Sequence, residues 1–292
     1  MTGVAITRRS VLAGLPVLAA PVQVAGQGVL PTAREVFARI RQASGQPWDP
    51  NPTDDRIIYG DRAVPVTGIA TCFTASVDVL RRARAAGLNY IIPHEASFFE
   101  RYDDFAESAV ADKDPVLVAK QRYLDANMMV VQRMHSHAHS RPGDAIMTGL
   151  LQQLGWAQLP QAGNPPVISI APITAASLGQ HLKQRCGRRV LRMAGDPARQ
   201  IRTVSLSAGM PGENLQIGQL EAGAHAVVLG EVREPEVLGY LQDMGARAPV
   251  TYLLGHTAED FGMGILATWL AKVFPHMPVR WIAGGDPYFD VG

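Results

Sequence analysis

The chain has 292 residues, of which 47% are apolar and 18% charged, as expected for a globular protein with one large domain or two smaller ones. Its 27 basic and 26 acidic residues leave a formal net charge of +1, so no whole-molecule field attracts a nucleic acid or an anionic membrane. Beyond residue 30, no apolar run reaches the roughly 18 to 20 residues that span a bilayer. Neither nucleic acid nor, once the N-terminal segment is removed, a membrane is therefore an expected partner.

The first segment, residues 1–28, has the layout of a twin-arginine export signal. Arg8 and Arg9 precede a short, Ala-rich apolar stretch at 11–25, and a polar exit follows. This stretch is too short to span a membrane. The alternative is an N-terminal arm that happens to contain two arginines. We expect a cleaved signal and a periplasmic protein, or one otherwise exported through the twin-arginine route; the cleavage position stays open.

Helix and strand signals alternate through the first half of the mature chain, residues 29–164. Thr32 supplies a capping hydroxyl ahead of an apolar face with helical spacing. A strand–helix–strand unit follows and implies a parallel sheet, in which ligands collect beyond the carboxyl ends of strands. The expected elements are a helix ending near 44–45, a loop at 46–55, strands at 66–72, 89–93 and 128–134, and helices at 76–86, 114–127 and 144–154.

The second half, residues 165–292, continues the alternation after a candidate linker at 163–166. The closing segment 257–274 has the pattern of a long amphipathic helix. The remaining expected elements are strands at 167–170, 190–193, 203–207, 226–229, 250–254 and 279–283, and a helix at 175–184. Both halves therefore belong to the α/β class, and we expect two domains, 29–164 and 165–292.

Five of the eight histidines occur where predicted strands end, and three of them form the segment His135-Ser136-His137-Ala138-His139. In an extended segment, side chains two and four positions apart point to one side, so three imidazoles can face one cavity. Burying three neutral imidazoles on one face costs their hydration free energy, and little offsets this cost unless the imidazoles bind a ligand. This triple therefore predicts a metal site.

Two further places carry an imidazole beside a carboxylate. His94 and Glu95 follow one predicted strand, and His256 precedes Glu259 and Asp260 after another. If a helix starts there, His256 shares a face with either carboxylate. A mixed set of imidazoles and carboxylates suits zinc, manganese or iron, and two nearby divalent cations would neutralise so many acceptors.

Two known metal-hydrolase patterns fit the triple poorly. The metallo-β-lactamase signature requires Asp and then His where this chain has His139 and Ser140. An amidohydrolase barrel places its His-x-His on the first strand, whereas more than a hundred residues precede His135. Neither fold is the expected one.

A closer resemblance is to the Nif-three-like family, whose members are also called GTP cyclohydrolase type 2 homologues. Residues 66–99 resemble its opening half, with His94-Glu95-Ala96 where most members have His-His-Pro. Residues 135–139 are similar to its His-Thr-x-x-Asp element, with His139 in place of the aspartate. The resemblance implies ligand roles for His94, Glu95 and His139.

The second half carries the same resemblance. Leu229-Gly230-Glu231 resembles the Thr-Gly-Glu of the family. Residues 255–259 resemble its closing Gly-His-x-x-x-Glu, with one residue fewer between the ligands. The resemblance implies that His256 is a ligand together with Glu259 or Asp260, of which we prefer Glu259 because Gly262 and Met263 keep the register of the family.

The resemblance also implies a two-domain α/β subunit with mixed sheets, whose C-terminal helix and strand return to the metal site. It implies two divalent ions per subunit and a ring-like homo-hexamer. We expect a dinuclear metal-dependent hydrolase that acts on a small molecule by cyclohydrolase- or amidohydrolase-like chemistry. His135 or His137 would orient the substrate or move a proton, and Glu231 would support the site from behind the ligands. The alternative is a non-catalytic metal-binding or metal-delivery protein.

Overall fold

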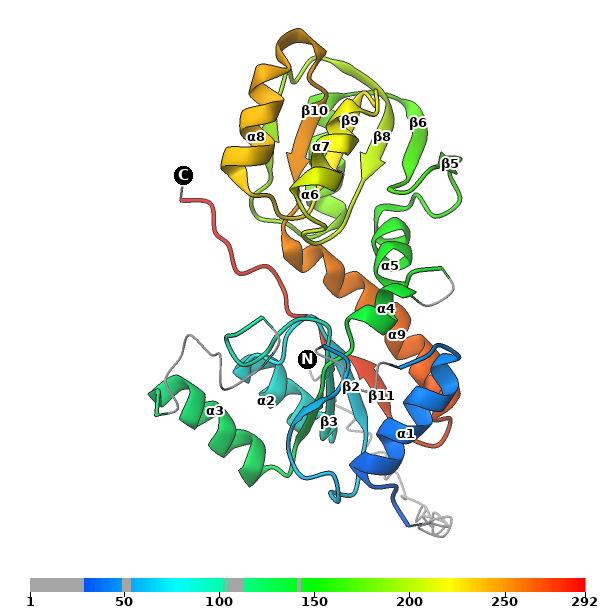
Figure 1. Cartoon of the computed structure of the whole chain (residues 1–292), viewed down its shortest axis with the longest axis vertical. Helices are drawn as coiled ribbons and strands as arrows, with labels where there is room; N and C mark the ends of the chain where they lie inside the picture. The colour runs from blue at the N-terminus through cyan, green and yellow to red at the C-terminus, as the bar shows by residue number, and fades with distance from the viewer. Residues whose placement is uncertain (1–28, 49–53, 102, 104–112, 141–142, 292) are drawn as a thin grey trace, which may run out of the picture. The chain divides into compact units, whose positions relative to one another are not determined.

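A computed structural model describes residues 29–48, 54–101, 103, 113–140 and 143–291. All of its helices and strands lie in one unit of the chain, Pro31–Gly292, and Figure 1 colours them from blue to red along the sequence. The expected export signal at 1–28 lies outside the described residues. No described helix combines the length and the apolar character needed to cross a membrane.

The first of two sheets has five strands, and its core is parallel. Its strands are β1 (Ile57–Tyr59), β2 (Ile69–Cys72), β3 (Tyr90–Pro93), β4 (Val130–Gln132) and β11 (Val279–Trp281). They lie in the order β1-β4-β3-β2-β11, and β1 alone among them runs antiparallel to its neighbour. The last strand of the chain is therefore paired with β2 of the first half.

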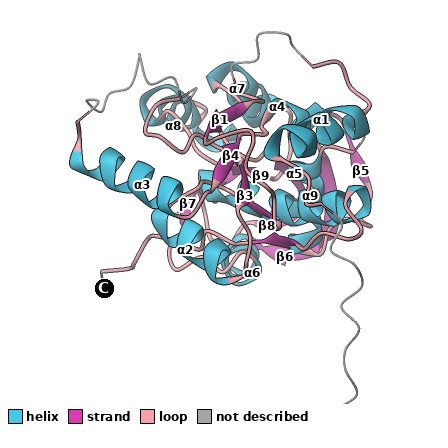
Figure 2. Cartoon of the chain, turned by 90° about the horizontal axis from the view of Figure 1, so that it is seen from below, coloured by secondary structure: helices cyan, strands magenta, loops and turns pink. Residues whose placement is uncertain are grey.

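Helices cover both faces of this sheet. Ile69 faces a core shared with α1 (Ala33–Ser44) and α9 (Asp260–Val273), and the next residue, Ala70, faces a core shared with α2 (Val77–Ala85) and α3 (Pro115–Ala126). Figure 2 shows α2 and α3 on one side of β3 and β4 and α1 on the other. Burial on both faces explains why β2 and β3 carry no charged side chain and are mostly apolar.

The second sheet has six strands. They are β5 (Gln161–Ala162), β6 (Val167–Thr174), β7 (Arg192–Ala194), β8 (Gln200–Leu206), β9 (Ala226–Leu229) and β10 (Val250–Leu253). Their order is β5-β6-β8-β9-β10-β7, with β8, β9 and β10 parallel and the other pairs antiparallel. Both sheets are mixed, which confirms the expected α/β class. Residues 163–166, expected as a linker, form the turn between β5 and β6.

Four helices pack on the second sheet. Helices α5 (Ala145–Leu154) and α6 (Ala175–Arg185) share one apolar core with it, and α7 (Glu213–Glu221) and α8 (Glu234–Asp243) lie against its other face. Helices α7 and α8 and strands β1 and β5 were not among the elements expected from the sequence. Helix α7 lacks an apolar stripe because its buried side includes Gln216 and Gln219. Gln219 donates from Nε2 to the hydroxyl of Ser205 at 3.1 Å, so this helix packs through polar contacts.

Helices α5 and α9 link the two sheets by packing closely against each other. A Cβ at Gly149 would lie 2.5 Å from the backbone nitrogen of Gly262, so the two helices meet at positions without side chains. A short 3-10 helix, η2 (His256–Glu259), leads from β10 directly into α9. The contact with α5 therefore positions the start of α9, and with it the residues of η2.

Candidate metal centre

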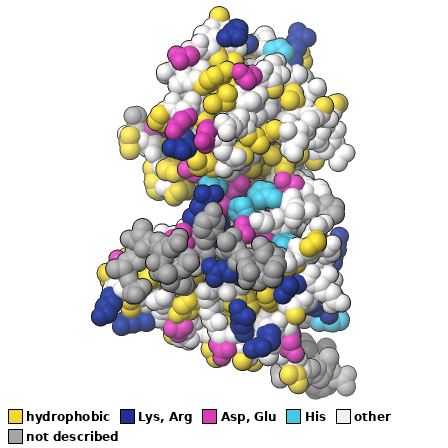
Figure 3. Space-filling model, in the orientation of Figure 1, with side chains coloured by type: hydrophobic (Ala, Val, Ile, Leu, Met, Phe, Trp, Pro, Cys, Tyr) yellow, Lys and Arg dark blue, Asp and Glu magenta, His cyan; other side chains and the backbone are white. Residues whose placement is uncertain are grey.

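Histidine and acidic side chains follow the carboxyl ends of strands in both sheets. His94 comes directly after β3, and His135 follows β4 by three residues. In the second sheet, Glu231 follows β9 and His256 follows β10. Figure 3 shows histidine and acidic side chains gathered at one level of the molecule. These strand ends are where ligands collect in parallel sheets.

Two carboxylates join the residues of the two sheets. Glu95 Oε1 lies 3.4 Å from Nε2 of His135 and 3.4 Å from Nε2 of His256. Glu259 Oε2 lies 3.3 Å from Nε2 of His94 and 3.2 Å from Nε2 of His256. His256 therefore contacts both carboxylates, and segments more than 150 residues apart meet at one site.

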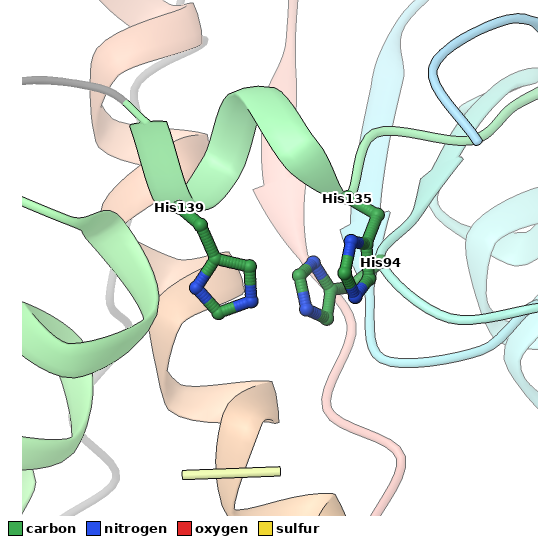
Figure 4. A group of neighbouring side chains, drawn as sticks. All are labelled: His94, His135 and His139. Atoms are coloured by element: carbon green, nitrogen blue, oxygen red, sulfur yellow. The ribbon is translucent and has the colours of Figure 1, made fainter. Parts of the chain in front are cut away.

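Three of the histidines face one another across a small space. The ring centroids of His94 and His135 are 4.5 Å apart, and each is 5.1 Å from that of His139. Figure 4 shows the three rings turned towards a common space, with His135 and His139 at the two ends of the helix α4 (Ser136–Ser140). Ligand atoms of these three residues lie within 4.8 Å of one another, and so do those of His94, Glu95 and Glu259. Both groups have the composition of candidate metal sites.

The Nδ1 atom of each of the four histidines faces an oxygen atom outside the cluster. The Nδ1 contacts are His94 with the carbonyl oxygen of Met134 (3.3 Å), His135 with Asp54 (3.4 Å), His139 with Asp144 (3.4 Å) and His256 with Glu231 (2.9 Å). A carbonyl oxygen only accepts, so Nδ1 of His94 carries the proton and Nε2 keeps its lone pair. Histidines that ligate a metal are typically oriented in this way.

Two buried atoms at the centre show that a cation would fit. His94 Nε2 and Glu259 Oε2 are buried, and neither has a hydrogen-bond partner among the described residues. The two atoms are 3.3 Å apart, but their geometry does not meet the angles of a hydrogen bond. Buried polar atoms without partners are costly, and a metal ion would satisfy both. Imidazole nitrogens with carboxylate oxygens suit zinc, manganese or iron.

The electrostatics of the cluster also favour positive charge. Burial would raise the pKa of Glu259, but the imidazoles of His256 and His94 beside it outweigh burial and lower that pKa to about 2. Burial likewise opposes ionisation of Glu95, whose pKa nevertheless falls well below its usual range because His135 and His256 donate to it. Both carboxylates are therefore ionised at neutral pH, which is the form that binds metal.

His137 does not join this cluster. The expected extended conformation of 135–139 was wrong, because α4 is helical and places residues four apart, not two apart, on one face. His137 points to the opposite side, where Nδ1 contacts the Asp55 carboxylate and Nε2 lies 3.2 Å from the carbonyl oxygen of Pro47. Its ring also stacks on Trp48, with centroids 3.8 Å apart. His137 therefore holds Pro47, Trp48 and Asp55 against α4 and does not face the cluster.

The helix also changes the position of His135. It was expected to orient a substrate, but its Nε2 faces Glu95 within the candidate ligand group. Glu231 Oε2 lies 2.9 Å from Nδ1 of His256, on the side of the ring away from the cluster. Asp260, the rival of Glu259, accepts hydrogen bonds from Trp281 Nε1 (2.8 Å) and the Gly284 backbone (2.7 Å). Glu259 is the one of the two that reaches the cluster.

Sequence reasoning missed the acidic and basic residues that hold the ligands. Arg133 donates from Nε to the His94 carbonyl oxygen (3.1 Å) and from Nη2 to Glu95 Oε2 (3.1 Å). Asp54 and Asp55 approach the start of α4 from a loop about 80 residues earlier in the chain. The only signal was a pair of aspartates in a polar loop, a pattern common in turns.

A cavity of about 560 Å³ opens beside the cluster. His256 and Glu231 line it together with Leu253 and the aromatic side chains of Tyr288 and Phe289 from the C-terminal segment. Its volume is within the usual range for small-molecule sites. The candidate metal centre therefore has space for a ligand next to His256.

Comparison with known proteins agrees with this architecture. No curated protein matches the chain. Solved structures with the same fold include a Bacillus cereus protein related to NIF3 (13% identity, TM-score 0.69, 90% of this chain and 100% of that chain) and the Staphylococcus aureus hypothetical protein SA1388 (15% identity, TM-score 0.67, 90% of this chain and 100% of that chain). Reduced HcgD from Methanocaldococcus jannaschii is also similar (13%, 0.59, 86% and 97%). The model of the family Duf34/NIF3 (NGG1p interacting factor 3) matches residues 48–284, so the chain belongs to this family.

Proposed function

We propose that this member of the DUF34/NIF3 family binds two divalent metal ions and is a dinuclear metal-dependent hydrolase of a small molecule. One observation carries the proposal: the Nε2 atoms of four histidines converge with the buried carboxylate of Glu259 and the partly buried one of Glu95, beside a cavity of about 560 Å³. The chemistry would be the opening or cleavage of a C–N or ester-type bond, as in cyclohydrolases and amidohydrolases. The residues that would hold the ions are His94, Glu95, His135, His139, His256 and Glu259.

The two oxygens of the Glu259 carboxylate face different histidines, which supports the proposal of two metal ions. Its Oε2 faces His94 and His256, while its Oε1 lies 4.0 Å from Nε2 of His139. A carboxylate whose oxygens face different imidazoles is suited to bridging two cations. Six donor side chains also exceed the four that a single tetrahedral zinc site takes.

The chemistry divides between the cations and the chain. A divalent cation would supply a Lewis acid and lower the pKa of water, so that water attacks at neutral pH. The chain would keep the ligands ionised and oriented, through Arg133 on Glu95 and through Glu231 on His256. The side chain of Glu231 is 53% exposed and lines the cavity, so it is placed to exchange a proton with a bound molecule.

The cavity favours a hydrolase over the alternative of a metal-delivery protein. Delivery would need the same ligands but no space shaped for a second molecule. Here, apolar and charged side chains enclose such a space beside His256. Metal delivery therefore remains as an outcome of the experiment below.

The test compares His94→Ala and Glu259→Gln with the wild type. Elemental analysis measures the metal bound to each purified protein, and a panel of cyclic amide, amide and ester substrates measures hydrolysis. His276→Ala serves as the matched control, because His276 is exposed and lies outside the candidate ligand groups. We expect both ligand variants to lose metal and turnover and the control to keep both. Stoichiometric metal without turnover on any substrate class would instead favour metal delivery.

The cellular location follows from the N-terminal segment. We infer that residues 1–28 direct the folded protein through the twin-arginine route to the periplasm. Arg8 and Arg9 ahead of an Ala-rich stretch support this proposal. Sequencing the N-terminus of exported protein tests it, and an exported chain that begins at Met1 would contradict cleavage.

The assembly is inferred from the family resemblance alone. We propose a ring-like homo-hexamer with its metal centres facing an internal cavity. Light scattering on the purified, uncleaved chain measures the mass, which for six subunits is six times 31.4 kDa. A monomer or dimer at micromolar concentration would contradict the proposal.

A further inference from the structure

The cavity beside the candidate metal centre contains one basic side chain without an acidic partner. Three carboxylates line the cavity, and each already has a donor. Glu234 pairs with Arg192, Glu231 contacts Nδ1 of His256 at 2.9 Å, and Asp286 accepts from the backbone nitrogens of Arg189 (2.7 Å) and Tyr288 (3.2 Å). Arg188 also lines the cavity, and it forms no ion pair with any carboxylate that the structure describes.

Arg188 is also deeply buried. Its relative exposure is 8%, and its Nε and Nη2 atoms are buried without a hydrogen-bond partner in the described part of the chain. Its backbone is held in place, because its nitrogen donates to the Lys183 carbonyl oxygen at 2.8 Å just after α6. The charge of Asp260 is near enough to act on Arg188 but forms no ion pair with it, and a guanidinium with unpaired donors is costly to bury. An unpaired buried guanidinium is expected at a binding site where the ligand supplies the anion that pairs with it.

The C-terminal segment encloses the same space. Asp286 and Phe289 line the cavity, and the Arg189 guanidinium lies 4.1 Å from the centroid of the Phe289 ring. Figure 1 shows this segment, in red, leading away from β11 to the C-terminus. The contacts of Arg189 therefore fasten the segment next to Arg188, which helps to keep Arg188 from water. A shielded charge attracts an anion more strongly than an exposed one.

We propose that Arg188 binds an oxyanion, a phosphate or a carboxylate, carried by the small molecule on which the metal centre acts. This inference rests on the proposed hydrolase function and names its substrate class: an anionic small molecule. A guanidinium presents paired donors that match two oxygens of a phosphate or carboxylate. Because Arg188 and His256 line one cavity, a single molecule can contact Arg188 with its anionic group and reach the candidate ligands with another.

The first test measures oxyanion binding by isothermal titration calorimetry with the full chain as purified. Wild type, Arg188→Met and Arg188→Lys are titrated with inorganic phosphate and, separately, with acetate. Arg202→Met is the matched control, because Arg202 is an exposed arginine of β8 that does not line the cavity. We expect Arg188→Met to weaken binding at least about tenfold and the control to leave it unchanged. The anion whose affinity depends on Arg188 identifies the group, phosphate or carboxylate.

A second readout separates ligand binding from a structural role. Without ligand, Arg188→Met is expected to unfold at the same temperature as the wild type or higher, because it removes an unpaired buried charge. The bound anion should raise the Tm of the wild type and of Arg202→Met, but not that of Arg188→Met. A structural arginine would instead lower the Tm when replaced and leave the anion-dependent shift intact.

The outcomes also separate this inference from the metal function. Metal content is measured on the same samples. Arg188-dependent anion binding in protein without metal would support the anion site and count against the metal centre. Two results would overturn the inference: the wild type binds neither anion, or Arg188→Met binds them as tightly as the wild type does. If the metal sites are fully occupied in those samples, the proposal of a metal centre is unaffected.

Discussion

Gly209 lies against the carboxylate of Glu259, and a Cβ at position 209 would fall 2.7 Å from the Glu259 Cδ atom. Gly209 also has a φ of +57°, which favours glycine. We expect Gly209→Ala to displace the Glu259 carboxylate from His94 and to weaken metal binding by about tenfold or more. Competition with a chelating dye measures the affinity.

A matched control separates the carboxylate from the backbone conformation. Gly245 has nearly the same φ, +56°, and a Cβ there would meet open space. Gly245→Ala should cost about 1 kcal/mol of folding stability and leave metal affinity unchanged. Equal metal affinity in the two variants would show that Gly209 does not position Glu259.

His135 and His137 are expected to differ sharply when each is replaced by alanine. His137→Ala leaves the buried Asp55 carboxylate without its imidazole and removes the stacking on Trp48, so it should cost about 3 kcal/mol of stability. His135→Ala should instead reduce metal content with a smaller loss of stability, because its ring is partly exposed. Urea unfolding of chelator-treated protein and elemental analysis measure the two effects. A reversed pattern would contradict these roles.

Lys120 should make stability depend on pH. Its buried Nζ donates to the Ser97 carbonyl oxygen, and burial lowers its pKa to about 8 from the ordinary 10.5, against the opposing charge of Asp103. Between these values the unfolded chain binds the proton and the folded chain does not, so this residue makes stability rise with pH, by up to about 3 kcal/mol.

Urea unfolding at pH 7.5 and 10.5 measures that rise. Lys120→Met should remove this rise, so the difference in unfolding free energy between the wild type and the variant shrinks as the pH increases. Lys183→Met is the control, because Lys183 is exposed on α6. If the stabilities of the wild type and of Lys120→Met change with pH in the same way, Lys120 is not deprotonated in the folded protein.

Metal removal is expected to lower thermal stability. The ligands come from segments far apart in the chain, so a bound ion holds the folded state more tightly than the unfolded one. Free metal at about 100 times its Kd adds about 2.7 kcal/mol. Calorimetry with and without chelator should show a lower Tm for the stripped wild type and no difference for His94→Ala. A chelator effect that persists in His94→Ala would place the ion elsewhere.

Several elements of the fold were predictable within a few residues. The helix α2 is one example: a helix was expected at 76–86, and Ser76 caps it by accepting from the Val79 nitrogen at 3.3 Å. The strands β2 and β3 on either side are buried on both faces, so their apolar runs stood out. Strong local signals explain this success, because caps and burial on two faces act on neighbouring residues alone.

Other elements had no such local signal. Helix α7 buries glutamines, so it shows no apolar stripe. The segment at 135–139 alternates histidine with small residues, a pattern that is compatible with a strand or with one helical turn. The helical form became clear only from packing, because Asp55 accepts from the backbone nitrogen of His137 at 2.8 Å across 82 residues.

The amino-acid sequence by itself determined the α/β class and which residue types follow the strands, because periodicity and caps report on single elements. It also placed His94, Glu95, His139, His256 and Glu259 as candidates. Only the tertiary structure decided that Nε2 atoms turn inwards, that His137 turns away and that Arg188 has no acidic partner among the described residues. These side-chain orientations depend on contacts between segments that are far apart in the chain. The packing of the two sheets brings those segments together.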